Sequence, residues 1–84
     1  MAVDEKVKTI LSELSGQRVI ENDFSLQNDL ALDSLSMVTL LIEIENVFEI
    51  QLDEADMNPF DLETVDDIIA LVKRYGVLDH AEEN

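Results

Sequence analysis

Ser34 is the residue of this chain whose surroundings point most directly to chemistry. It follows Asp33 and precedes Leu35, at the start of a strongly apolar stretch. A serine that acts as a nucleophile needs a nearby base, but the only histidine, His80, lies near the end of the sequence, and Asp33 is poorly placed to remove the proton. Because a G-x-S-x-G motif is also absent, hydrolase activity is not supported, and Ser34 is predicted to be modified by another enzyme.

A group of oxygen-bearing side chains between residues 53 and 61 is the second candidate for chemistry. Its members are Asp53, Glu54, Asp56, Asn58 and Asp61. Calcium loops of the EF-hand type need oxygen ligands at alternate positions, a central glycine and a terminal glutamate. Here Phe60 interrupts the series, and the segment contains no glycine. Since the chain also has no cysteine to supply thiolates or disulfides, we predict no dedicated metal site.

The charge of the chain is strongly unbalanced, with 20 acidic and 5 basic residues and a net charge of −15. Binding to nucleic acids or anionic membranes requires Lys or Arg, so we expect neither as a partner, whereas basic protein surfaces are attracted. An acidic coat kept only for solubility is the alternative. No stretch is long enough to span a bilayer, and we expect a cytoplasmic monomer without membrane insertion.

Hydrophobic periodicity predicts an all-α domain over residues 1–78, followed by a flexible acidic tail at residues 79–84. The first helix is expected at Val3–Leu14, and the strongest at Ser34–Glu49 with Asp33 as its N-cap. This second helix is apolar nearly all round, so we expect it to be the central element, contacted on several sides. Its narrow polar stripe consists of Ser36, Thr39, Glu43 and Asn46.

The remaining segments are expected to close the domain. The last helix begins at Thr64, where Asp67 completes a capping box, and it ends near Gly76. A short turn is expected at residues 58–61 because proline is tolerated only at a helix start. The long connection at residues 15–33 is expected to be pinned to the helices by its apolar side chains, namely Val19, Ile20, Phe24, Leu26, Leu30 and Leu32.

The residues around Ser34 carry a resemblance to a known family. The run Leu30-Ala31-Leu32-Asp33-Ser34-Leu35 is similar to the L-G-x-D-S-L signature of acyl carrier proteins. Glu45–Phe48 resembles the end of that family's second helix, and Thr64–Ile68 resembles the start of its last helix. The resemblance covers residues 3–75. It implies a four-helix bundle of the acyl-carrier type, with a long loop between helices one and two and a short third helix.

The same resemblance implies a function. A phosphopantetheinyl transferase would attach 4′-phosphopantetheine from coenzyme A to Ser34, with Asp33 and Leu35 beside it in the cofactor-binding motif. The terminal thiol would carry acyl or aminoacyl groups as thioesters and present them to a loading enzyme and downstream synthases with basic patches, while the protein itself supplies no catalysis. Partner contacts are implied at Ser36, Met37, Thr39, Glu43, Glu45, Glu49, Asp53, Glu54 and Asp56.

Departures from the family pattern narrow this interpretation. Ala31 stands in the usual place of a glycine, and the segment Met57–Leu62 is longer than in the housekeeping carrier. Ser36 and Thr39 are neutral where carriers of fatty acid synthesis typically have acids. We therefore predict a specialised, free-standing carrier of a dedicated pathway, such as a polyketide or aminoacyl pathway. The alternatives are a housekeeping carrier of fatty acid synthesis and, from another class, an unmodified acidic helical adaptor in which Ser34 is only structural.

The apolar residues of the second helix leave two interpretations open. Under the first they complete the core, as Met37, Leu40, Ile44 and Val47. Under the second, a space that opens for an acyl chain is bordered by Leu40, Ile44, Leu62 and Ile68. A long acyl group needs that space, whereas small polar cargo does not.

Overall fold

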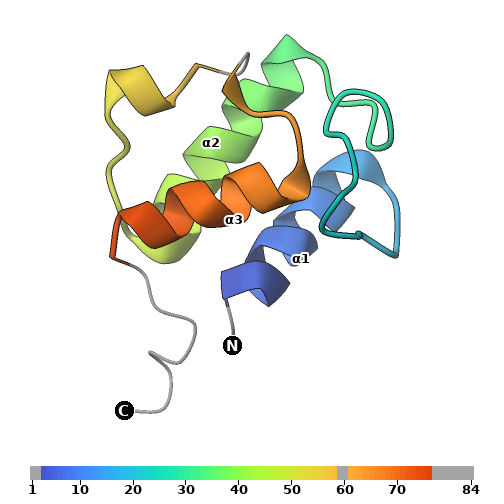
Figure 1. Ribbon diagram of the computed structural model, residues 1–84, viewed down its shortest axis with the longest axis horizontal. Coiled ribbons are helices and arrows are strands. Elements are labelled where there is room, and N and C mark those ends of the chain that lie inside the picture. Colours follow the sequence, from blue (N-terminus) through green and yellow to red (C-terminus); the bar gives the residue numbers. More distant parts are fainter. Residues whose placement is uncertain (1–2, 59–60, 77–84) are drawn as a thin grey trace.

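The computed structural model describes residues 3–58 and 61–76, and this part of the chain is all-helical (Figure 1). Apart from an isolated bridge between Ser25 and Thr64, the described residues form no β-structure. The three predicted α-helices are confirmed, with small shifts at their ends. The elements are α1 at Val3–Ser15, α2 at Ser34–Phe48, a 3₁₀ turn, η1, at Glu54–Asp56, and α3 at Val65–Arg74.

Local capping explains where the helices begin and end. Before α2, the Asp33 carboxylate accepts a hydrogen bond from the Ser36 N–H at 2.8 Å. Before α3, Thr64 and Asp67 form the predicted capping box. At the other end of α2, Glu49 has a φ of +55°, in the left-handed region that commonly terminates helices. The sequence therefore sets these boundaries through contacts within a single turn.

The helices share the core unequally, because α1 lies against both α2 and α3 (Figure 1). The prediction that the second helix is the central element is therefore wrong. A domain of this size has too few neighbouring elements to enclose one helix on all sides. Helix α2 buries Met37, Leu40, Leu41 and Ile44. Phe48 is half-buried against the core. Four other apolar residues of α2 stay exposed, namely Leu35, Val38, Ile42 and Val47, and the last of these was expected in the core.

The connection at residues 15–33 is held by burial and by backbone hydrogen bonds to the start of α3. The Leu26 N–H donates to the Glu63 carbonyl at 2.8 Å, and the Val65 N–H donates to the Phe24 carbonyl at 3.1 Å. Val19 is 64% exposed, so its predicted role as a pin is wrong, because its neighbour faces the core instead. The other predicted pins are buried or half-buried, namely Ile20, Phe24, Leu26, Leu30 and Leu32.

The short third helix of the predicted four-helix bundle is not confirmed by the described residues. Between α2 and α3 they contain the three-residue turn η1, in which no residue is buried. The turn expected at 58–61 includes residues 59 and 60, which lie outside the described part of the chain, as do the predicted tail at 79–84 and His80.

Candidate functional site

Ser34 is the first residue of α2, and its side chain is exposed. Within the described residues its hydroxyl has no hydrogen-bond partner, because the neighbouring Asp33 carboxylate is directed to the Ser36 N–H. This N–H lowers the pKa of the Asp33 carboxyl. The Asp33 carbonyl also accepts the Met37 N–H at 2.9 Å. Asp33 therefore acts as the cap of α2 and leaves the Ser34 hydroxyl free at the surface.

The backbone that leads to Ser34 is held in a tight conformation. The Leu32 N–H donates to the Leu26 carbonyl at 2.9 Å, and the side chains of Leu30 and Leu32 are buried on either side of Ala31. Ala31 itself has a φ of +56°, a region in which glycine is favoured. The position that resembles the glycine of the family signature therefore has the backbone conformation for which glycine is best suited.

An exposed apolar strip runs along α2 from the residue after Ser34. It consists of Leu35, Val38 and Ile42, which are 74%, 41% and 47% exposed. Their spacing of three and four residues places them on one face of the helix, and the first turn of α2 contains no acid. The nearly all-round apolar character of this helix predicted contacts on several sides, but this strip stays uncovered. The spacing was visible in the sequence, but it did not show which apolar face would stay uncovered.

The residues with implied partner contacts divide into three groups. Met37 is 1% exposed, so it belongs to the core and not to the expected surface. It lies on the buried face of α2, a helix that packs against α1. Ser36 is half-buried, and five further residues are exposed, namely Thr39, Glu43, Glu49, Asp53 and Glu54. Glu45 and Asp56 form the third group, because both are engaged in contacts within the protein.

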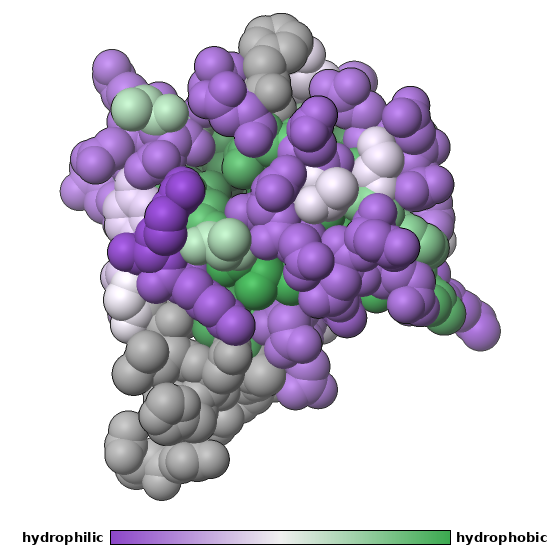
Figure 2. Space-filling model, in the orientation of Figure 1, coloured by the Kyte–Doolittle hydropathy of each residue, from purple (hydrophilic) through white to green (hydrophobic). Residues whose placement is uncertain are grey.

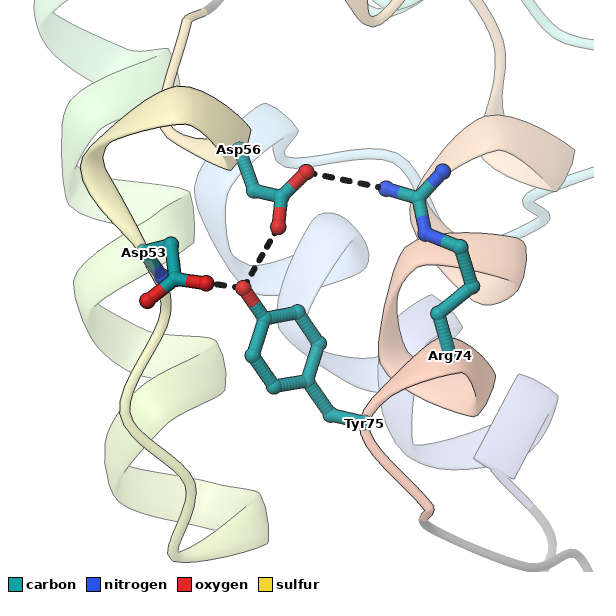
Figure 3. A network of polar contacts seen from close by, with 4 residues as sticks. All are labelled: Asp53, Asp56, Arg74 and Tyr75. Atoms are coloured by element: carbon teal, nitrogen blue, oxygen red, sulfur yellow. Dashed lines mark hydrogen bonds and ion pairs between the residues drawn. The ribbon is translucent and has the colours of Figure 1, made fainter.

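Glu45 and Asp56 each anchor the segment that follows α2. Glu45 accepts a hydrogen bond from the Leu52 N–H at 2.9 Å. Asp56 accepts a hydrogen bond from the Tyr75 hydroxyl at 2.5 Å and forms an ion pair with Arg74 at 3.2 Å (Figure 3). The hydrogen bond to the Asp56 carboxylate raises the pKa of Tyr75 above its ordinary value. Two of the predicted partner-facing carboxylates thus have structural partners of their own.

The residues expected to border an acyl space lie together in the closed core. Leu40, Ile44 and Ile68 are fully buried, and Leu62 is 8% exposed. Leu62 lines a surface hollow of about 220 Å³ together with Asp56, Arg74 and other residues. The core interpretation agrees with the burial of Met37, Leu40 and Ile44, whereas Val47 is 40% exposed. A space that opens for an acyl chain stays a prediction.

The face of the protein shown in Figure 2 is largely hydrophilic, with hydrophobic residues visible in the gaps between hydrophilic ones. Within residues 3–58 and 61–76, no helix combines the length and apolar character needed to cross a membrane. The same residues contain no group of three or more His, Cys, Asp or Glu arranged to hold a metal ion.

Comparison with known proteins shows the family. A sequence profile described as "Phosphopantetheine attachment site" matches residues 5–72. An acyl carrier protein of Thermotoga maritima is 34% identical over 71 residues, which cover 82% of this chain and 85% of that protein. An acyl carrier protein of Streptococcus pneumoniae is 39% identical over 74 residues, which cover 87% of this chain and 95% of that protein. The Non-reducing polyketide synthase dbaI of Emericella nidulans is 40% identical over 70 residues, 82% of this chain but 2% of that protein.

The all-helical fold and the profile match define a carrier protein with a phosphopantetheine attachment domain. The chain belongs to the acyl carrier protein family, and its cofactor is covalently attached 4′-phosphopantetheine. The start of α2 fits this group. An exposed hydroxyl lies there, without a partner among residues 3–58 and 61–76, at a helix N-terminus where N–H groups and the helix dipole favour an anion.

Proposed function

We propose that this protein carries acyl or aminoacyl intermediates as thioesters on a 4′-phosphopantetheine arm attached to Ser34. In the loading step, a phosphopantetheinyl transferase joins the Ser34 oxygen to the phosphorus of the phosphopantetheine unit. Adenosine 3′,5′-bisphosphate leaves coenzyme A, and the hydroxyl proton passes to a base of the transferase. The protein supplies no catalytic group and presents the loaded thiol to partner enzymes with basic surfaces.

The observation that carries this proposal is the state of the Ser34 hydroxyl. Ser12 donates a hydrogen bond to the Gln17 carbonyl at 2.5 Å, and Ser15 and Ser25 accept backbone N–H groups at 3.2 Å and 3.1 Å. Ser36 is half-buried and its side chain helps to lower the pKa of Asp33. Among the serines, Ser34 alone is exposed without a partner in the described part of the chain, so a transferase can reach it at no cost in internal contacts.

The apolar strip of α2 supports a role in presenting cargo. Because Leu35, Val38 and Ile42 start beside Ser34 and stay exposed, an enzyme that receives the arm would bury them as it binds. Exposed apolar residues on one face are typical of surfaces that contact other proteins. We further propose that η1 occupies the place of the family's short third helix.

A dedicated pathway is proposed because of the neutral residues near Ser34. The half of α2 that follows Ser34 has no charged side chain before Glu43, so basic groups of a partner have no acid to contact there. The similarity to a segment of a polyketide synthase supports the same interpretation. A housekeeping role in fatty acid synthesis is the alternative.

Intact-mass analysis tests the attachment site. After incubation with coenzyme A and a broad-specificity phosphopantetheinyl transferase, we expect one phosphopantetheine to be added to the wild-type protein and none to the Ser34→Ala variant. Ser36→Ala is the matched control, since it removes a hydroxyl two residues away, and it should still be modified. Modification of Ser34→Ala, or none of the wild type, would contradict the proposal and favour the unmodified adaptor.

The pathway is tested by turnover with a generic fatty acid synthase system. We expect the wild-type holo protein to be used poorly, and the Ser36→Asp, Thr39→Glu double variant to be used better. Turnover of the wild type at the rate of that system's own carrier would refute a dedicated pathway and leave the housekeeping role.

A further inference from the structure

Tyr75 joins the end of α3 to a segment that lies about 20 residues earlier in the chain. Its hydroxyl donates a hydrogen bond to the Asp56 carboxylate at 2.5 Å and accepts one from the Asp53 N–H at 2.9 Å (Figure 3). Arg74 adds an ion pair to the same carboxylate at 3.2 Å. The Tyr75 hydroxyl therefore holds the segment at two points, at Asp53 just before η1 and at Asp56, the last residue of η1.

The turn η1 has few other interactions to hold it in place. It is three residues long, none of its residues is buried, and its N-cap, Asp53, makes no side-chain capping hydrogen bond. The preceding residue, Leu52, is buried and fixes the turn on one side. A single helical turn is not stable by itself in water. On its other side η1 is therefore held by Met57, which is half-buried against the core, and by the polar contacts of Tyr75 and Arg74.

The acidic side chains of this segment differ in whether they have a partner within the protein. Asp56 is paired with Arg74, whereas Asp53 and Glu54 are exposed, and their carboxylates form no ion pair among the described residues. Figure 1 shows the chain turning back after α2, so that η1 lies toward the end of α2 at which Ser34 is found. Because both side chains are exposed, the basic surface of a partner enzyme can contact these two carboxylates.

We propose that Tyr75 is a positioning residue for partner recognition, because its hydroxyl holds Asp53 and Glu54 where the basic surface of a partner enzyme contacts them. The inference rests on the proposed carrier function. Tyr75 acts through the turn and is itself half-buried against the core, so it need not touch the partner.

Loading of the full chain by a phosphopantetheinyl transferase tests this role. Tyr75→Phe keeps the ring and removes only the hydroxyl, so it should raise the KM for the carrier about threefold, which is the scale of one net hydrogen bond, and leave kcat unchanged. The difference from the wild type should shrink at high salt, because the contact is electrostatic. Amide hydrogen exchange at Asp53 and Asp56 should become faster in the variant.

Two further proteins separate positioning from general stability. Ser12→Ala removes a hydroxyl hydrogen bond between α1 and Gln17, and it should leave KM unchanged even if it lowers the melting temperature. In a protein that already carries Asp53→Asn and Glu54→Gln, adding Tyr75→Phe should not raise KM further, since coupled residues are not additive.

An unchanged KM in Tyr75→Phe, or an equal rise when Asp53 and Glu54 have been neutralised, would overturn the positioning role while the carrier function stands. A wild-type chain that the transferase does not modify would refute the carrier function itself and this inference with it.

Discussion

The backbone strain at Ala31 gives a stability prediction with a definite sign. Ala31 has a φ of +56°, three residues before Ser34. The left-handed region costs a residue with a Cβ about 1–2 kcal/mol relative to glycine. A glycine also makes the unfolded chain more flexible, and this lowers the free energy of unfolding by about 0.4–1 kcal/mol. The difference predicts that Ala31→Gly raises the free energy of unfolding by about 0.5–1 kcal/mol.

The assay is urea denaturation followed by helical circular dichroism, together with a thermal melt. For a domain of this length, the gain corresponds to a rise of about 2–8 °C in Tm. Ala70→Gly is the matched control, because Ala70 is exposed within α3 and the same chemical change should there lower stability by about 0.5–1 kcal/mol. A fall in stability for Ala31→Gly, with the denaturant slope unchanged, would refute the assignment of strain to this residue.

Other predictions concern the caps and the Tyr75 contact. Thr64→Ala removes half of the capping box of α3 and should lower the free energy of unfolding by about 1 kcal/mol in urea denaturation; an unchanged midpoint would mean that Asp67 caps the helix alone. The lowered pKa of Asp33 stabilises the folded state above the unfolded pKa, and this contribution disappears as the pH falls through the folded pKa. Because asparagine caps without a charge, the stability gap between the wild type and Asp33→Asn should be present at pH 7 and close in acid, and a gap independent of pH would contradict this. Tyr75 is the single tyrosine of the chain, and its pKa is raised by Asp56. Its phenolate absorbance should therefore appear above pH 10, its ordinary pKa, and move back toward that value in Asp56→Asn; identical titrations in the two proteins would argue against the hydrogen bond.

The features that the sequence determined by itself are those that depend on residues close together in the chain. Asp33 caps α2 through an amide three residues away, and Thr64 and Asp67 cap α3 within one turn. These contacts were predictable because the side chain and its backbone partner are held near each other whatever the rest of the fold does. The start of α2, and with it the placement of Ser34 on the first helical turn, followed for the same reason.

Tertiary structure decided which apolar and charged side chains remain at the surface. Met37 and Val38 are adjacent and both apolar, yet the first is 1% exposed and the second 41%, because only one face of α2 turns toward α1. Likewise, the Asp56 carboxylate is engaged by Arg74 and Tyr75, which lie 18 and 19 residues away. Periodicity shows that a helix has an apolar face, but the uncovered part of that face and the pairing of distant charges depend on how the elements are placed in space.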